Sequence, residues 1–278
     1  MIPRVLMALA ALLLAAPSLA QAQTQTETPL RWRAVLVAGD PSLPVWDNAA
    51  RRLADRLLAS GQAVPGQVVR LTARRDQLAT GARPGGLDAA STAIQSIRPE
   101  AGEGCLVFLS MHGAPDAGLI FAPEGRPLTP NLLDKLLQLG CGDAPTLVVA
   151  SGCYSGGFAA GRMARDNRVV LTAARPDRAS FGCGAGFELT VFDDCLLQGI
   201  VTGGAVAALR ERVRDCVRAE EARLRVSPPS EPAAHLGAAV RDLSLAPMPR
   251  GAAEPPPRPA PAPPAVAPPI EPSRRKTG

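Results

Sequence analysis

The chain has 278 residues and a formal net charge of +5, and its cations are almost wholly arginine because Lys135 and Lys276 are the only lysines. The arginines are scattered and aromatic residues make up 3% of the chain, which disfavours nucleic-acid binding, since that needs clustered cations and stacking platforms. The six cysteines form no CxxC or CxxH pair and there are two histidines, so we expect no structural zinc site, no other metal and no cofactor.

The first 22 residues have the pattern of a secretory signal peptide. Arg4 precedes an apolar stretch from Val5 to Ala16, and small residues follow up to Ala22. The apolar stretch is too short to cross a bilayer, so no integral membrane segment is expected once the signal is removed. The pattern predicts a protein that is exported to the periplasm or secreted.

The middle of the chain alternates apolar runs of strand length with helical patterns. In chain order we expect a strand over 31–38, a helix over 47–60, a strand over 68–71, a helix over 87–97, strands over 105–111 and 118–121, a helix over 129–139, strands over 146–151 and 168–174, and helices over 188–198 and 205–225. This alternation predicts an α/β fold with three layers. The main strands are continuously apolar, which is typical of a mostly parallel central sheet covered on both faces.

We expect one folded domain over residues 30–243, long enough to bury a sizeable core. Proline and alanine crowd together over 244–278, and such a segment has little to bury. It is interpreted as an extended, solvated tail that acts as a spacer. A partner that docks on this proline-rich tail is the alternative.

Two strand patterns each end at one reactive side chain with glycine beside it. The first runs from Cys105 to His112 and Gly113, and the second runs from Thr146 to Cys153. Because the carboxyl ends of parallel strands share one edge of a sheet, we expect the imidazole and the thiol to meet there. That pair is the minimum equipment for catalysis by a cysteine nucleophile.

A free thiol needs activation, and the sequence offers two sources. A helix near Phe158 would direct its N-terminal dipole at Cys153, and His112 would supply charge and later a proton. The backbone amides of Gly113 and Cys153 could face a developing oxyanion. The alternatives are a buried structural cysteine and a loop histidine. A serine hydrolase is disfavoured because Tyr154 stands where a nucleophile elbow needs serine.

The remaining cysteines and the second histidine are interpreted as residues without a catalytic role. If Cys153 stays free, at most two disulfides can form among the other five cysteines, and the sequence does not assign them. Cys105 is interpreted as a small buried hydrophobic residue. His235 lies in a weakly structured C-terminal stretch and is interpreted as incidental.

These motifs resemble the legumain-type cysteine peptidases, in particular their bacterial exported relatives. The resemblance rests on the strand-His-Gly turn at His112, the strand-Cys-Tyr-Ser-Gly turn at Cys153 and the stretch Leu171–Cys183, and it extends over about 31–240. It implies a caspase-like fold, a His112–Cys153 dyad and peptidase or transpeptidase activity, commonly after asparagine or aspartate. It also implies protein or peptide substrates and an oxyanion amide from Gly113.

The resemblance also implies a substrate pocket. Ser180 and Asp194 occupy places that match the small hydroxyl and acidic residues of the family's pocket. Asp47 and Asn48 fall where animal and plant legumains carry an arginine–histidine pair, which leaves the asparagine preference open. Tyr154 replaces an acid next to the nucleophile. The long C-terminal domain that silences legumain precursors has no counterpart, so any control of activity must use another device.

The leading hypothesis is an exported cysteine endopeptidase that works through a thioester acyl-enzyme formed by Cys153 and His112. Two alternatives stay open. One is a catalytically silent caspase-like scaffold that binds partners. The other is a transamidase, which would use the same dyad to join peptides.

Overall fold

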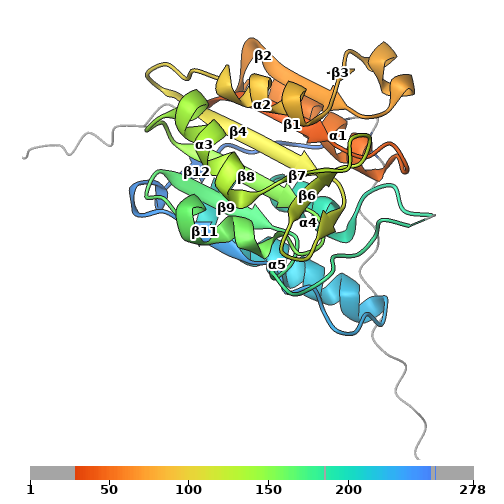
Figure 1. Cartoon of the computed structure of the whole chain (residues 1–278). Coiled ribbons are helices and arrows are strands. Elements are labelled where there is room, and N and C mark those ends of the chain that lie inside the picture. The colour runs from red at the N-terminus through yellow and green to blue at the C-terminus, as the bar shows by residue number, and fades with distance from the viewer. Residues whose placement is uncertain (1–28, 185, 252–253, 255–278) are drawn as a thin grey trace, which may run out of the picture.

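The computed structural model describes residues 29–184, 186–251 and 254. Its centre is a seven-stranded sheet in the order β11-β9-β8-β4-β1-β2-β3 (Figure 1). The strands of this sheet are β1 (Arg31–Ala38), β2 (Ala63–Thr72), β3 (Arg83–Pro84), β4 (Glu103–Ser110), β8 (Thr146–Ser151), β9 (Arg168–Thr172) and β11 (Ala234–Leu236). All pairings are parallel except that of β11 with β9.

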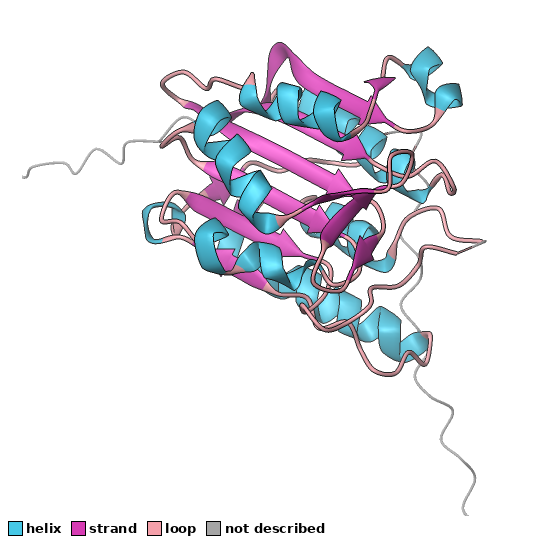
Figure 2. Cartoon of the chain, in the orientation of Figure 1, coloured by secondary structure: helices cyan, strands magenta, loops and turns pink. Residues whose placement is uncertain are grey.

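Helices cover both faces of this sheet (Figure 2). One face is covered by α1 (Val45–Ala59), α4 (Val191–Gly199) and α5 (Val206–Arg223), and the other by α2 (Leu87–Gln95) and α3 (Pro130–Cys141). Among the described residues, no helix has both the length and the apolar character that a bilayer crossing needs. The predicted three-layer α/β sandwich with a mostly parallel sheet is therefore confirmed.

Side-chain alternation along β1 shows how the sequence makes two cores. Ala34 and Leu36 point to the core under α1, α4 and α5, whereas Val35 and Val37 point to the core under α2 and α3. The buried middle of a central strand therefore has to be apolar on both sides, which is why these strand patterns are continuous rather than alternating. A separate, small antiparallel sheet follows the carboxyl end of β4. It consists of β5 (Gly113–Ala114), β6 (Gly118–Phe121) and β7 (Arg126–Leu128).

Strand β2 is longer than the expected strand over 68–71, because it begins at Ala63. Pro65 and Gly66 lie inside it, between Ala63 and Val68, where the pairing with β1 shifts register. They are tolerated because of this irregularity and because β2 pairs with β3 only through Leu71 and Thr72, so the proline amide is not needed on the outer edge.

Four cysteines form two disulfides. Cys105 in β4 is bonded to Cys141 at the end of α3, so the reading of Cys105 as a plain buried hydrophobic residue is wrong. Cys195 in α4 is bonded to Cys216 in α5. Cys153 and Cys183 remain free, in agreement with the limit of two bridges. The pairings depend on tertiary contacts between elements that sequence spacing does not reveal.

The packed part of the chain extends beyond the expected boundary at residue 243. Short strand β12 (Ser244–Leu245) pairs with β10 (Gly204–Ala205), and Met248 is buried in the core. Beyond it, Glu254 pairs with the buried guanidinium of Arg56. The solvated tail predicted over 244–278 therefore begins too early, because its first residues are packed. Its remainder and the predicted signal peptide over 1–22 lie outside the described residues.

His235 also differs from its expectation. It lies in β11 and pairs in register with Val170, so the stretch around it is ordered as an edge strand. Its Nε2 is 2.9 Å from the carbonyl oxygen of Arg165.

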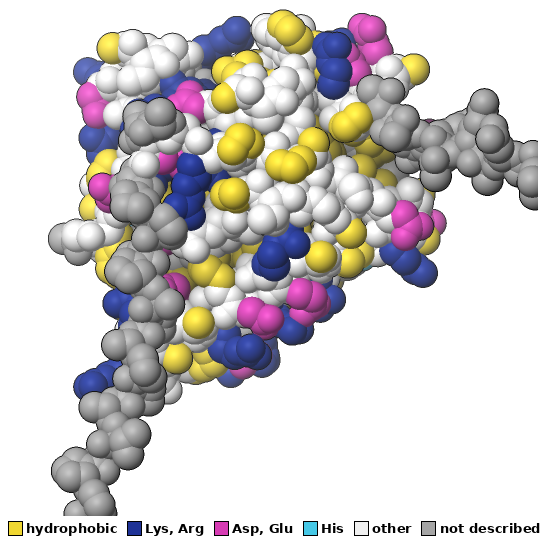
Figure 3. Space-filling model, turned by 180° about the vertical axis from the view of Figure 1, so that it is seen from behind, with side chains coloured by type: hydrophobic (Ala, Val, Ile, Leu, Met, Phe, Trp, Pro, Cys, Tyr) yellow, Lys and Arg dark blue, Asp and Glu magenta, His cyan; other side chains and the backbone are white. Residues whose placement is uncertain are grey.

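On the face shown in Figure 3, Lys and Arg side chains are interspersed with Asp and Glu rather than gathered in a single basic patch.

A buried ion pair stabilises the amino-terminal edge of the sheet. The carboxylate of Asp134 in α3 accepts hydrogen bonds from Arg168, the first residue of β9, and from Arg165. The side chains of Asp134 and Arg168 are each 1% exposed. A buried arginine without its partner would carry an uncompensated charge, so each side chain of the pair depends on the other.

We expect Asp134→Ala to lower the free energy of unfolding by about 3–5 kcal/mol, because it leaves the buried Arg168 charge unpaired. Urea denaturation at neutral pH measures the change. The matched control is Asp88→Ala, which removes a carboxylate that is 84% exposed and paired with Arg126. The control should cost less than about 1 kcal/mol. Equal costs for the two variants would contradict the assignment.

Candidate active site

The parallel register of β4 and β8 brings the two reactive motifs together. Ser110 and Ser151 are register partners at the last positions of these strands, and the amide of Met111 donates to the carbonyl of Ser151 at 3.1 Å. His112 follows Ser110 by two residues, and Cys153 follows Ser151 by two residues. The imidazole and the thiol are thus carried by adjacent turns at the carboxyl edge of the sheet.

The two turns touch, and glycine makes this contact possible. A Cβ atom on Gly113 would lie 1.9 Å from the carbonyl oxygen of Cys153 and 3.4 Å from its amide nitrogen. A Cβ atom on Gly152 would lie 2.6 Å from the carbonyl oxygen of Met111 and 3.5 Å from the amide nitrogen of Gly113. Any larger side chain at Gly113 would separate the turns, so the close approach accounts for glycine at this position.

The thiol of Cys153 is half-buried and faces Ser180. The backbone amide of Ser180 donates to the sulfur at 3.3 Å, and the thiol reaches the Ser180 carbonyl oxygen at 3.6 Å. Among the described residues, the hydrogen bonds of this thiol go to Ser180, and the thiol and the imidazole are not hydrogen-bonded to each other. These contacts hold the sulfur beside the backbone of Ser180, so Ser180 contributes to the site through its backbone.

The chain after the nucleophile turns sharply. Tyr154 has the left-handed φ of 57°, and its amide donates to the carbonyl of Arg178 at 2.7 Å. The buried hydroxyl of Ser155 accepts from the amides of Ala173 and Ala174, at the end of β9. A strained residue held between two fixed anchors is typical of a functional turn.

The expected helix near Phe158 is a five-residue 3₁₀ segment, Ser155–Ala159. So short a segment has few aligned peptide dipoles, and the expectation that a helix dipole activates Cys153 is therefore wrong. Glycine at positions 156 and 157 limits the segment to one turn.

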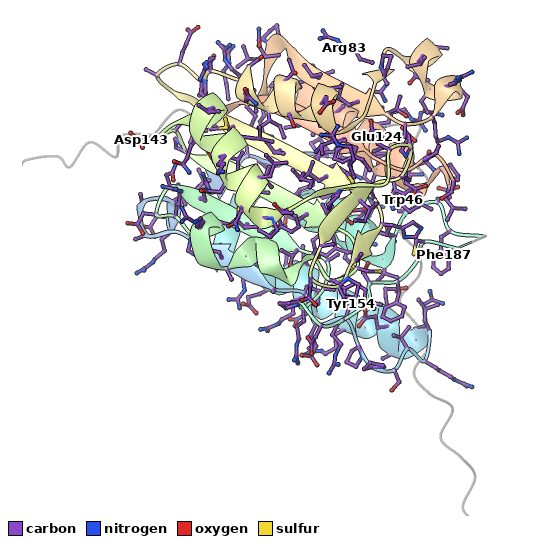
Figure 4. The ribbon with its side chains drawn as sticks, in the orientation of Figure 1. Trp46, Arg83, Glu124, Asp143, Tyr154 and Phe187 are labelled. Carbon is purple, nitrogen blue, oxygen red and sulfur yellow. A yellow bond between two sulfur atoms is a disulfide. The ribbon has the colours of Figure 1, made fainter. Side chains whose placement is uncertain are left out.

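The imidazole of His112 packs against an aromatic ring. The ring centroids of His112 and Trp46 lie 4.9 Å apart at an interplanar angle of 71°, an edge-to-face contact. Trp46 is 1% exposed and comes from the first turn of α1. Figure 4 shows Trp46, Tyr154 and Phe187 near the carboxyl ends of the strands, with Asp143 at the opposite end. Trp46 thus restricts the orientation of the imidazole.

Below the two turns lies a fully buried carboxyl group. Asp193 in α4 is 0% exposed, and its Oδ2 accepts a hydrogen bond from the hydroxyl of Ser110 at 2.7 Å. The hydroxyls of Ser151 and Thr190 also favour its charged form, but burial outweighs them and raises the pKa of Asp193 to about 6. Its other oxygen, Oδ1, is buried and has no hydrogen-bond partner among the described residues.

The other three predicted pocket residues make contacts elsewhere. Asp47 is 6% exposed and faces Arg74, and burial raises the pKa of its carboxyl. The side-chain amide of Asn48 donates through its Nδ2 to the backbone carbonyl of Glu188 at 2.9 Å. Asp194 lines a pocket of about 460 Å³ beside α1 and α4. Of the four predicted pocket residues, Ser180 is the one that contacts the Cys153 thiol.

The comparisons with known proteins agree with this geometry. Residues 85–199 match the Peptidase C13 family, the family of the legumains. This part of the chain thus resembles the legumains, and the fold is similar to that of the caspases. Its fold is similar to the crystal structure of caspase-1 from Spodoptera frugiperda, with a TM-score of 0.54 and 13% identity over 81% of this chain and 92% of that chain.

A second solved structure, pro-sf-caspase-1, has a TM-score of 0.50 and 13% identity over 76% of this chain and 93% of that chain. At this identity the likeness shows the fold alone. A comparison with curated proteins finds no match. The resemblance to legumain-type peptidases and the caspase-like fold that it implied are confirmed.

Two residues of this legumain-like site escaped the sequence analysis. Trp46 directly precedes Asp47 and Asn48, which were given pocket roles, and Asp193 directly precedes Asp194, the acid assigned to the pocket. Helical spacing could have identified Asp193, because Leu196 and Leu197, three and four residues on, share its face of α4 and are buried. Nothing in the sequence indicates that an indole meets the imidazole.

The carboxyl of Asp193 should make the stability of this legumain-like fold depend on pH. Because its pKa rises from 3.8 to about 6, the folded state holds the proton more tightly than the unfolded chain does. The stabilisation is fully present below 3.8 and is lost as pH rises through 6. The neighbouring Asp194 carboxylate contributes to the same shift.

We therefore expect wild type to lose about 3 kcal/mol of unfolding free energy, relative to Asp193→Asn, between about pH 4 and pH 7. The asparagine variant has no proton to release at this position. Urea denaturation of both proteins across this range measures the difference. Parallel stability curves would show that the carboxyl is not buried in this way.

We also expect Gly113→Ala to lower the free energy of unfolding by about 1–3 kcal/mol, because the new methyl group collides with the backbone of Cys153. The matched control is Gly157→Ala, where a Cβ would meet its nearest atom, in Pro130, at an ordinary 3.6 Å. The control should change stability by less than about 0.5 kcal/mol. Urea denaturation compares the two, and an unperturbed Gly113→Ala would mean that the turns do not touch.

Proposed function

We propose that this chain is an exported cysteine endopeptidase in which Cys153 is the nucleophile and His112 is the general acid and base. The Peptidase C13 family implies cysteine peptidase or transamidase activity. The observation that supports the residue assignment is the contact between the turn of Gly113 and the backbone of Cys153. It sets the two reactive side chains on neighbouring turns at the end of parallel strands.

The first half of the reaction forms an acyl-enzyme. The imidazole of His112 accepts the thiol proton as the sulfur of Cys153 attacks the carbonyl carbon of the scissile bond. The carbonyl oxygen becomes an oxyanion, and the backbone amides of Gly113 and Cys153 stabilise it. As the C–N bond breaks, the imidazolium gives its proton to the leaving amine, and the acyl group remains on sulfur as a thioester.

The second half releases the acyl group. His112 accepts a proton from a water molecule, the hydroxide attacks the thioester carbon, and the sulfur leaves as the thiolate and is reprotonated. If an amine takes the place of water, the same steps join two peptides, which is the transamidase alternative. The two outcomes differ in the mass of the product, and mass spectrometry of a peptide reaction separates them.

Two contacts support the placement of the reactive groups. The amide of Ser180 points at the sulfur of Cys153, and the edge-to-face contact with Trp46 restricts the imidazole. We propose peptides cut after asparagine or aspartate as the substrates to test first, on the basis of the family resemblance. A peptide library read by mass spectrometry determines the preference.

Export is part of the proposal. The two disulfides among the described residues support it, because such bonds persist in oxidising compartments. The signal-like sequence over 1–22 supports it as well. Mass spectrometry of the protein purified from a periplasmic or secreted fraction should find the mature chain beginning after Ala22. A retained Met1 on the exported protein would contradict removal of the signal.

We expect Cys153→Ala and His112→Ala each to lower peptide hydrolysis by at least about 10³-fold, because each removes one half of the dyad. The chain offers a matched control for each, since Cys183 is the other free thiol and His235 the other histidine. Cys183→Ala and His235→Ala should keep activity within about threefold of wild type.

A peptide with a thiol-reactive warhead should label wild type and Cys183→Ala but not Cys153→Ala, as read by intact-protein mass spectrometry. Hydrolysis that survives in Cys153→Ala would refute the nucleophile. If the folded wild-type protein neither hydrolyses the library nor takes the label, the catalytically silent scaffold becomes the correct reading.

A further inference from the structure

One buried polar cluster lies directly below the two reactive turns. It consists of Ser110, Ser151 and Asp193, called the strand-end cluster here, and their side chains are 0%, 2% and 0% exposed. It is surrounded by apolar residues, among them Phe192 and Cys195 of the same helix. Burying a carboxyl group in such a place lowers stability, so its presence points to a role other than stability.

The two serines hold equivalent places in the two strands. Each is the last residue of its strand, each precedes a reactive residue by two positions, and the two are register partners. A single residue, Met111 or Gly152, separates each serine from the reactive residue that follows it. A contact that fixes Ser110, the register partner of Ser151, therefore restrains the backbone from which the reactive turns begin.

Asp193 is itself held in a fixed place. Its backbone amide donates to the hydroxyl of Thr190, the N-cap of α4, at 3.0 Å. Two residues further on, Cys195 bonds α4 covalently to α5. The carboxyl is thus presented from a helix whose start is capped and whose body is cross-linked, so its Oδ2 is a rigid acceptor for the hydroxyl of Ser110 at 2.7 Å.

We propose that Asp193 is a positioning residue, which sets the relative placement of the turns that carry His112 and Cys153 through its hydrogen bond to Ser110, the register partner of Ser151. This inference rests on the proposed function of the dyad. Asp193 does not touch the reacting atoms, so its effect is on the geometry of attack rather than on binding of the substrate. A shift of about 1 Å between reacting groups can lower a rate by about 100-fold.

The test removes the whole cluster at once. The triple variant Ser110→Ala, Ser151→Ala and Asp193→Ala deletes every polar group of the cluster and leaves no carboxyl without a partner. In the full chain we expect kcat to fall by about 10- to 100-fold while KM changes by less than about threefold. Near-ultraviolet circular dichroism and the two disulfides report that the fold is kept. A folded triple variant with wild-type kcat overturns the proposal.

A matched control separates positioning from stability. Asp134→Asn alters another buried carboxyl, 1% exposed, at the opposite edge of the sheet beside the start of β9. It should lower stability and leave the kcat of the folded protein within about twofold of wild type. If it lowers kcat as much as the triple variant does, the effect belongs to stability and the proposal fails.

Ser110→Ala alone keeps the proposal testable if the triple variant does not fold, because it deletes the single hydroxyl that donates to Asp193. It should lower kcat by at least about threefold with KM unchanged, and an unchanged kcat would overturn the inference.

The rate of Cys153 alkylation by iodoacetamide gives a readout that does not need hydrolysis. It should fall by at least about threefold in Ser110→Ala, because the turns lose their relative placement and with it the thiol its position near the imidazole. Absent hydrolysis in wild type defeats the proposed function. An unchanged alkylation rate in the variant defeats the positioning role.

Discussion

The contact between two backbone turns is the constraint on which this structure depends. Gly113 lies so close to the carbonyl of Cys153 that no side chain fits between them. The contact exists because β4 and β8 are parallel neighbours in exact pairing from Cys105 with Thr146 to Ser110 with Ser151. A fold with these strands apart, or shifted by one residue, would separate the imidazole from the thiol.

The layers around the sheet serve this one edge in different ways. α1 supplies Trp46 to the imidazole, and the loop before α4 supplies the Ser180 amide to the sulfur. α4 supplies a buried carboxyl beneath both turns. The opposite edge has a different character, because Asp134 and Arg168 form an ion pair there that contributes to stability and lies away from the reactive residues.

The sequence predicts the main strands and helices well because continuous apolar runs and helical spacing are local signals. The edge location of His112 and Cys153 follows from them, since parallel strands share their carboxyl ends. The disulfide of Cys105 with Cys141, the ordered strand at His235 and the meeting of Trp46 with His112 are tertiary facts without a local signal. Asp193 and Asp194 are neighbours on α4 and point about 100° apart, so Asp193 is buried beneath the turns while Asp194 lines a pocket.

The most direct test of the account is an experimental structure of the protein with a peptide aldehyde, whose adduct mimics the tetrahedral intermediate. The account predicts a carbon–sulfur bond to Cys153, the adduct oxygen within about 3.2 Å of the amide nitrogens of Gly113 and Cys153, and the imidazole of His112 facing the adduct. An adduct on another residue, or an imidazole on a separate face from the sulfur, would contradict it.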